Sequence, residues 1–297
     1  MNERKLVSFD WALKRLLRSK ANYEVLEGFL SELLKEDIKI IEILESESNR
    51  DSARDKSNRV DMKVRNRKQE IILIEIQYER EFDYLQRILF ATAKAITEHI
   101  AEAEPYANIA KVISINILYF DLGHGEDYVY HGTTKFRGIH YHDELRLNNK
   151  QQELFGKQYP HELYPEYYLL KVNQFDDVAR DSLDEWIYFL KNGEIAEGFL
   201  AKGLARAKEI LDIMHLGEEE RRSYEWHREE LRYQASMYRS SFFDGHMEGK
   251  KEGLEEGREE GMGKEKKATT QIMKQAGEPM EKIMKYTQLT PEEVEAL

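Results

Sequence analysis

Cysteine is absent from the 297-residue sequence. This absence excludes a disulfide framework, catalysis by a thiolate and zinc bound by cysteine. Long apolar runs are absent as well, and no segment approaches the length that spans a bilayer. Residues 1–5 lead into an amphipathic segment rather than an apolar one, so no signal peptide is visible. We therefore expect a cytoplasmic protein that does not enter a membrane.

Positive charge is in deficit, because the chain carries a formal net charge of -12 at pH 7. The sum argues mildly against a nucleic-acid partner, but the distribution of charge matters more than its total. Basic residues gather in one stretch of the chain. They are Arg50, Arg54, Lys56, Arg59, Lys63, Arg65, Arg67 and Lys68. Such a cluster either lies beside a phosphate backbone or is a solvated basic loop.

Two short segments rich in valine and isoleucine, residues 59–65 and 71–78, are typical of strands joined by a polar turn. Glu75 and Gln77 are two residues apart in the second strand, so their side chains share a face. If the turn is centred between the strands, Asp61 lies opposite Glu75 or one diagonal step away. Two neighbouring carboxylates repel each other, and a hard divalent cation between them is the usual compensation.

The carboxylate, the hairpin and the Glu-x-Gln strand together resemble the metal site of the PD-(D/E)XK nuclease superfamily. Near the N-terminus, Phe9-Asp10-Trp11-Ala12-Leu13-Lys14 resembles the Asp-x-x-Phe-Lys opening helix of the recombination-promoting nuclease (Rpn) and transposase group, with Leu13 in place of phenylalanine. Arg87 occupies the position where that group carries an arginine on the following helix. The resemblance covers roughly the first half of the chain.

The resemblance implies an α/β fold with a restriction-endonuclease-like αβββαβ core, in which helices flank a mixed central sheet, and the rest of the chain forms an α-helical C-terminal extension. The hydrophobic pattern agrees with this order of elements. It predicts helices over 8–18, 22–35 and 82–102, a strand over 38–45 and a buried strand over 109–120. The longest of these helices is expected to bury an apolar stripe formed by Phe82, Leu85, Leu89, Ala93, Ile96 and Ile100.

Four parts are expected along the chain. They are a nuclease-like domain over 1–176, a helical extension over 177–244, a charged linker helix with glycine at every fourth position over 245–264, and a small helical unit over 265–297. The glycine repeat could pair two chains closely or form a mobile linker, since each glycine costs about 1 kcal/mol in a helix. The last unit could bind DNA or mediate self-association, so a homo-oligomer through the C-terminal helices is one expectation.

The resemblance also implies the chemistry, which is metal-dependent hydrolysis of a DNA phosphodiester bond in recombination or transposition. Asp61, Glu75 and the backbone carbonyl of Ile76 would bind Mg²⁺ or Mn²⁺, because these ions favour oxygen ligands. Asp10 would serve as an accessory carboxylate, and the alternative for it is a surface ion pair with Lys14.

Gln77 stands where many relatives carry lysine. A neutral amide can orient a water molecule but cannot take its proton at neutral pH, which makes slow turnover plausible. Glu47 is a weaker candidate for the same site. His140 and His142 share a strand face without a partnering cluster, so zinc is not expected there.

The basic residues expected to contact the DNA backbone are Arg59, Lys63, Arg87 and Lys14. For Arg87, an ordinary surface position on a helix is the alternative. Two other interpretations of the whole chain remain. One is a DNA-binding or assembly protein that keeps the fold without activity, and the other is a surface ion-pair network in which Asp61 and Glu75 face water.

Overall fold

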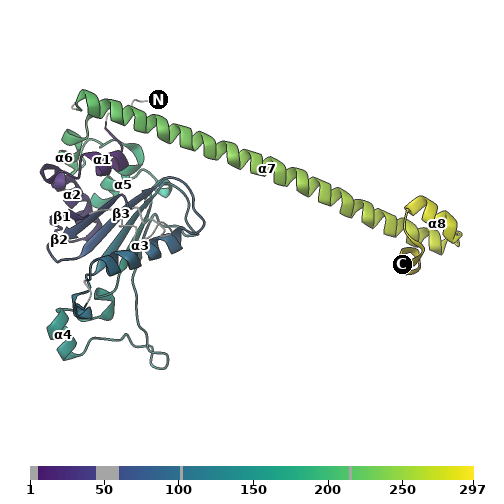
Figure 1. The fold of residues 1–297 in the computed structure, drawn as a ribbon, viewed down its shortest axis with the longest axis horizontal. Helices are drawn as coiled ribbons and strands as arrows, with labels where there is room; N and C mark the ends of the chain where they lie inside the picture. Colours follow the sequence, from purple (N-terminus) through teal and green to yellow (C-terminus); the bar gives the residue numbers. More distant parts are fainter. Residues whose placement is uncertain (1–5, 45–59, 101–102, 214–215) are drawn as a thin grey trace. The chain divides into compact units, whose positions relative to one another are not determined.

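The computed structural model describes residues 6–44, 60–100, 103–213 and 216–297. Two compact units are present, Met1–Tyr224 and Glu225–Leu297, and each is described by itself. The first contains a central sheet with helices on both faces, and the second contains most of a long helix and two short ones (Figure 1). Within the described ranges, no helix is both long and apolar enough to cross a bilayer.

A six-stranded mixed sheet forms the centre of the first unit, in the order β1-β2-β3-β4-β6-β5. The strands are β1 (Ile40–Leu44), β2 (Met62–Asn66), β3 (Ile71–Gln77), β4 (Val112–Leu118), β5 (Val129–Gly132) and β6 (Glu166–Lys171). Strands β1, β2 and β3 are antiparallel neighbours, β3, β4 and β6 run parallel, and β5 is antiparallel to β6. This order confirms the predicted α/β fold with an αβββαβ core.

Helices cover both faces of the sheet. The α-helices of the described residues in both units are α1 (Phe9–Arg15), α2 (Tyr23–Leu34), α3 (Tyr84–Glu98), α4 (Asn149–Phe155), α5 (Ser182–Asn192), α6 (Leu204–Ile210), α7 (Glu218–Gln275), α8 (Met280–Thr287) and α9 (Pro291–Glu295). One face packs on α1, α2, α5 and α6, and the other packs on α3. The rings of Phe9, Phe29 and Trp186 lie 5.5 to 6.1 Å apart and join α1, α2 and α5 in one core.

Strand β4 lies between β3 and β6, and every one of its residues is buried. This confirms the buried central strand predicted from the apolar run over 109–120. A strand with helices on both faces needs apolar side chains on both faces, so its sequence is continuously hydrophobic rather than alternating.

The buried face of α3 differs from the prediction. Tyr84, Ile88, Ala91 and Ala95 are buried against the sheet. Most of the expected stripe is in solvent instead, including Phe82, Leu85 and Leu89 at 91%, 52% and 60% exposure. Both sets of positions have helical spacing. The small side chains of Ala91 and Ala95 let the helix approach the sheet closely, which increases dispersion contact.

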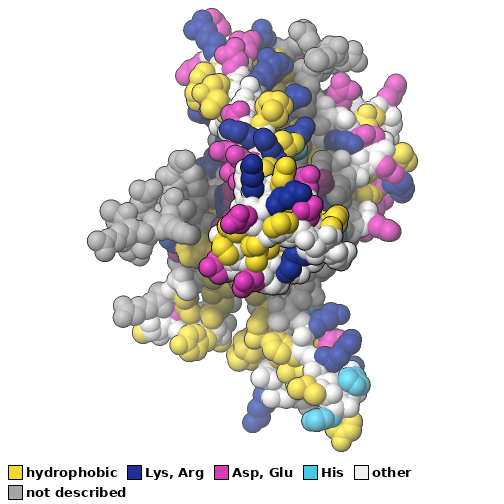
Figure 2. All heavy atoms as spheres, turned by 90° about the vertical axis from the view of Figure 1, so that its right-hand side faces the viewer, with side chains coloured by type: hydrophobic (Ala, Val, Ile, Leu, Met, Phe, Trp, Pro, Cys, Tyr) yellow, Lys and Arg dark blue, Asp and Glu magenta, His cyan; other side chains and the backbone are white. Residues whose placement is uncertain are grey.

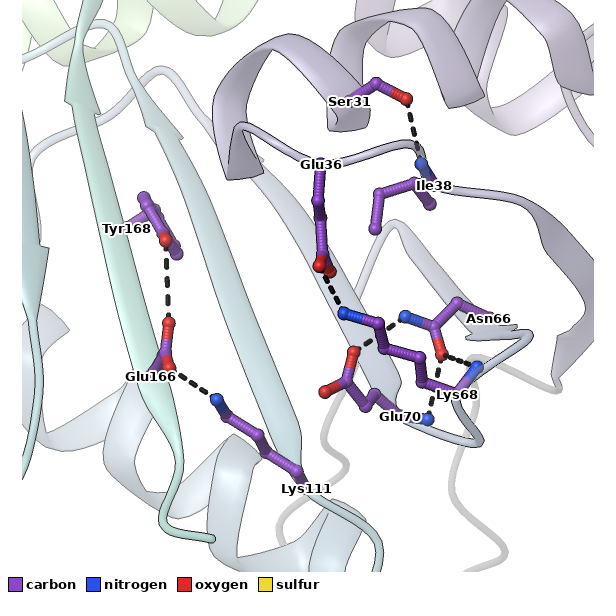
Figure 3. A network of polar contacts seen from close by, with 9 residues as sticks. All are labelled: Ser31, Glu36, Ile38, Asn66, Lys68, Glu70, Lys111, Glu166 and Tyr168. Atoms are coloured by element: carbon purple, nitrogen blue, oxygen red, sulfur yellow. Dashed lines mark hydrogen bonds and ion pairs between the residues drawn. The ribbon is translucent and has the colours of Figure 1, made fainter. Parts of the chain in front are cut away.

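The β2–β3 hairpin brings Asp61 beside Glu75. Met62 pairs with Ile74 in the antiparallel register, so Asp61 and Glu75 are the next residues that face each other across the two strands. This is the placement that the spacing of the two strands predicts. The polar turn closes the opposite end of the hairpin, where Lys68 pairs with Glu36 (Figure 3).

Only part of the predicted basic cluster lies in the described residues, and there Lys63, Arg65 and Lys68 each pair with an acidic residue of the fold. Positions 50–59 lie outside the described residues. Arg65 pairs with Glu42 on β1, and Lys68 belongs to the turn, about 13 Å or more from Glu75 along β3. On the face in Figure 2, the described Lys and Arg side chains are interspersed with Asp and Glu.

The turn end of the hairpin is instead part of a polar network. The side-chain oxygen of Asn66 accepts the backbone N–H groups of Lys68 and Glu70, which holds the turn (Figure 3). At the same end of the sheet, Lys111 before β4 pairs with Glu166 on β6. These contacts join neighbouring strands, so they serve the fold.

In the second unit, α7 continues as one helix through the glycine repeat at Gly245, Gly249, Gly253, Gly257 and Gly261. Among the described residues, nothing lies within 4 Å of a Cβ added at these glycines. Helix α9 lies against the end of α7, where Lys274 Nζ donates to the carbonyl of Val294 at 2.9 Å. A capping box begins α9, with Thr290 accepting the N–H of Glu293.

Candidate active site

Asp61 directly precedes β2 and is held by groups from two other elements. Its Oδ2 accepts the backbone N–H of Ile76 on β3 at 2.7 Å, and its Oδ1 pairs with Lys14 Nζ of α1 at 3.1 Å. Arg18 donates to the backbone carbonyl of Asp61 at 3.1 Å. The Asp61 side chain keeps 16% exposure, so its oxygens are oriented and still reachable from solvent.

Glu75 lies near the carboxyl end of β3 with its side chain almost fully buried. Its Oε1 pairs with Nη2 of Arg87 on α3. Burial raises the pKa of Glu75 to about 7, while Arg87 opposes the rise and the negative charges of Asp61 and Glu81 add to it. The contribution of Asp61 means that the two carboxylates interact, as neighbouring like charges do. A further cation beside them would therefore be favourable.

Gln77 is the last residue of β3 and shares a face with Glu75. Its amide nitrogen donates to Glu81 Oε1 at 2.9 Å and to the backbone carbonyl of Glu79 at 3.1 Å. Glu81 is not among the site residues predicted from the sequence. The one signal for it was its position in the short connection between the strand that carries Gln77 and the helix that carries Arg87.

Arg87 lies between two carboxylates. Its Nη2 pairs with Glu75, its Nη1 pairs with Glu81 at 2.5 Å, and its guanidinium lies 5.9 Å from the ring centre of Tyr84. Arg87 is thus a partly buried, paired arginine rather than an isolated surface residue. Direct contact between Arg87 and DNA stays a prediction.

Asp10 is buried on α1 and accepts a hydrogen bond from Tyr78 Oη at 3.1 Å. Tyr78 follows Gln77 directly in the chain, and its ring stacks on Tyr119 at 4.4 Å. Lys14, one helical turn after Asp10, pairs with Asp61. Helix α1 therefore contributes an acidic residue near the end of β3 and a cation to the Asp61 carboxylate.

A buried polar group lies next to Glu75 on the neighbouring strand. Asn116 of β4 is in register with Glu75 and accepts a hydrogen bond from Tyr84 Oη at 3.2 Å. Its amide nitrogen donates to Ser114 Oγ at 3.0 Å. Burial raises the pKa of Tyr84, and the charge of Glu75 adds to the rise, so the phenol stays neutral and acts as a donor. This group was not predicted, because polar residues within an apolar run give no sign of their partners.

Several predicted site residues are not brought into this group. Lys63 is buried beneath α3 and pairs at 3.0 Å with Glu98, the last residue of that helix, whereas Arg87 lies in its first turn. Direct contact between Lys63 and DNA stays a prediction. Arg59 and Glu47 lie outside the described residues, and His140 and His142 are exposed.

The donor atoms at this end of the hairpin suit a hard divalent cation. Carboxylate oxygens come from Asp61 and Glu75. The carbonyl of Ile76 points toward the strand that Asp61 precedes, because the N–H and C=O groups of a residue in an antiparallel pair point toward the same neighbouring strand. Such oxygen ligands match Mg²⁺ or Mn²⁺. Among the described residues, no group of three or more His, Asp or Glu side chains is arranged to hold a metal ion. A bound ion would therefore depend on the backbone and on water for further ligands.

Comparison with known proteins agrees with the fold. The family model described as PD-(D/E)XK nuclease family transposase matches residues 7–240, which include the whole sheet and α1 to α6. No curated protein and no solved structure matches the chain. Because the family match covers well over half of the sequence, this chain belongs to the PD-(D/E)XK nuclease family transposases.

Proposed function

We propose that the protein is a divalent-metal-dependent DNA endonuclease that hydrolyses phosphodiester bonds. The observation that carries this proposal is the pairing of Asp61 and Glu75 on adjacent strands. Asp61 is oriented by the N–H of Ile76, and its charge contributes to the raised pKa of Glu75. Family membership supports a nuclease or transposase-like function, and the paired carboxylates support the metal-dependent form of it.

Asp61, Glu75 and the carbonyl of Ile76 are the groups that would hold Mg²⁺ or Mn²⁺. Such an ion, when bound, stabilises charge on a phosphate and lowers the pKa of a water. The protein contributes preorganisation. Ile76 fixes the Asp61 carboxylate through its N–H, and Arg87 fixes the Glu75 carboxylate, so the acidic groups do not need to reorient when the substrate arrives.

The remaining site residues would orient substrate and water. Gln77 would hold the attacking water without taking its proton, because an amide does not ionise at neutral pH. Lys14 and Arg87 carry positive charge at the two carboxylates, where they would attract the phosphate backbone. Asp10 would act at longer range through Tyr78, whose hydroxyl it accepts.

Plasmid cleavage with Mg²⁺ or Mn²⁺ tests the proposal. Asp61→Asn and Glu75→Gln keep the size of each side chain and remove its charge, so cleavage should fall by at least about 100-fold. Glu42→Gln is the matched control, since Glu42 lies on β1 and pairs with Arg65. Its cleavage rate should equal that of the wild type. Full cleavage by both site variants would rule the proposal out.

A second candidate is a DNA-binding or assembly protein that keeps the nuclease fold without activity. Two observations favour it: Arg87 already neutralises Glu75, and Gln77 stands in place of lysine. This candidate predicts that the wild type binds DNA but neither binds Mn²⁺ nor cleaves. Calorimetric titration with Mn²⁺ distinguishes the two candidates, because the endonuclease should bind the ion and Asp61→Asn should bind it more weakly.

A role in DNA recombination or transposition is part of the proposal through family membership. Comparing cleavage of branched and linear duplexes of equal length would test this role. Faster cleavage of the branched duplex would support it, and equal rates would count against it.

A further inference from the structure

Glu81 makes two contacts that the proposed chemistry does not yet use. Its Oε1 accepts hydrogen bonds from Gln77 Nε2 at 2.9 Å and from Arg87 Nη1 at 2.5 Å. The backbone carbonyl of Glu79 accepts from the same Gln77 nitrogen at 3.1 Å. A carboxylate and a carbonyl can only accept hydrogen bonds, so they determine which end of the Gln77 amide faces them.

The orientation of the Gln77 amide follows from these partners. A primary amide nitrogen has two hydrogens, and both are engaged. Among the described residues, no donor contacts Oε1 of Gln77. Because the amide group is planar, Oε1 points away from Glu81. On the strand face that Gln77 shares with Glu75, the side chain therefore offers an acceptor.

We infer that Glu81 is a positioning residue, which turns the amide of Gln77 so that its oxygen accepts a hydrogen bond from the attacking water. This inference rests on the proposed hydrolysis. An accepted O–H bond orients the water while its proton stays on the water oxygen, so Gln77 acts through geometry alone. Glu81 also holds Arg87, which pairs with Glu75, so one carboxylate connects the amide to the acidic site.

This arrangement explains why residue 77 can be glutamine instead of lysine. A lysine at this position would direct its ammonium group to Glu81 and would offer donors only. A glutamine satisfies Glu81 with its nitrogen and keeps an oxygen for a second partner. The connection between β3 and α3 is short, which keeps Glu81 within reach of both Gln77 and Arg87.

The first test needs no cleavage activity. It measures solvent exchange of the Gln77 side-chain amide protons by NMR in metal-free protein, with Gln77→Met identifying the signals. Glu81→Ala should speed this exchange by about tenfold, because it removes a hydrogen bond to a charged acceptor. Glu81→Gln keeps an acceptor oxygen and should restore most of the protection. Arg87→Met leaves the Gln77–Glu81 bond in place and should change exchange by less than about twofold.

The second test measures single-turnover cleavage of plasmid DNA with Mg²⁺. Glu81→Ala should slow the chemical step by about 10- to 100-fold, as loss of an orienting partner does, and should change DNA affinity by less than about threefold. Glu81→Gln should recover most of the rate. Asp83→Asn is the matched control, because Asp83 is an exposed acidic residue close by whose side chain makes no capping bond. Its cleavage rate should match that of the wild type.

Two results would overturn the inference. One is unchanged Gln77 exchange in Glu81→Ala, and the other is a cleavage defect that Glu81→Gln fails to rescue although the exchange protection returns. A wild-type protein without any cleavage would instead refute the proposed endonuclease. The exchange measurement would still decide whether Glu81 sets the orientation of Gln77, so the two failures are distinguishable.

Discussion

Glu75 places a carboxylate in an almost closed environment, and burial raises its pKa from 4.5 to about 7. The folded state therefore binds this proton more tightly than the unfolded state does. The resulting stability is fully present below the unfolded pKa and is lost as the pH rises through the folded pKa. The window between pH 4.5 and about 7 should thus show the effect in metal-free protein.

We expect Glu75→Gln to be more stable than the wild type above pH 7, by at most about 3 kcal/mol. The difference should shrink as the pH falls and should vanish well below pH 4.5, where both side chains are neutral in either state. Urea unfolding at several pH values, with a chelator present, measures it. A difference that stays constant with pH would mean that Glu75 does not ionise in this window.

Lys63 is the second residue whose environment decides its role, because its ammonium group is enclosed under α3 with Glu98. Glu98→Ala leaves this buried charge unpaired and should lower the free energy of unfolding by about 2 kcal/mol. Lys63→Met removes the charge at similar volume and should change it by less than about 1 kcal/mol.

Lys63→Met also tests whether Lys63 contacts DNA or only Glu98 within the fold. Lys63→Met should leave both the DNA affinity and its salt dependence unchanged. A loss of about one unit in the slope of log K against log salt would show that Lys63 binds a phosphate after all.

At the scale of elements, the hairpin and α3 together build the site. The hairpin supplies Asp61, Glu75 and Gln77, and α3 supplies Arg87 from its sheet-facing side. Because α3 packs through Ala91 and Ala95, its axis lies close to the sheet and its first turn reaches the end of β3. The orientation of α3 about its own axis therefore controls the electrostatics of Glu75.

Substitutions on α3 should show which of its two apolar stripes is buried against the sheet. Ala91→Leu overfills the contact with the sheet and should lower the free energy of unfolding by about 1–3 kcal/mol. Leu85→Gln changes a side chain that is half exposed and should alter it by less than about 0.5 kcal/mol. Chemical denaturation measures both. The opposite ranking would mean that the stripe through Leu85 is the buried one.

At the scale of the whole molecule, the two compact units divide near Tyr224, within α7. Tyr224 belongs to the first unit, because its hydroxyl accepts the N–H of Ser8 at 3.2 Å and its ring packs on Trp11 at 5.4 Å. The start of α7 is therefore required by the fold that carries the site, and the remainder of the helix belongs to the second unit.

Truncation should show this division. A chain ending at residue 232 should fold with a site like that of the full chain, whereas a chain ending at residue 216 should lose about 2–3 kcal/mol of unfolding free energy with the buried Tyr224 ring. Tyr224→Ala in the full chain is the matched variant and should show a similar loss. Failure of the 232-residue chain to fold would mean that the second unit is needed by the first.

The amino-acid sequence by itself determined the types and order of the main elements, the buried character of β4 and the pairing of Asp61 with Glu75. These features follow from local periodicity and from hairpin geometry, since a strand alternates its faces and a short turn sets the register. The ordered motifs along the first half of the chain were also sufficient to indicate the family that the comparison identified.

Only the tertiary structure decided which side of each element is buried and which charges meet. Helix α3 carries two apolar stripes of equal helical spacing, and only contact with the sheet selects the one through Tyr84 and Ala91. That choice turns Arg87 toward Glu75 and Glu81, and it covers Lys63. The physical reason is that periodicity defines candidate faces within one element, whereas burial and charge pairing depend on residues far apart in the chain.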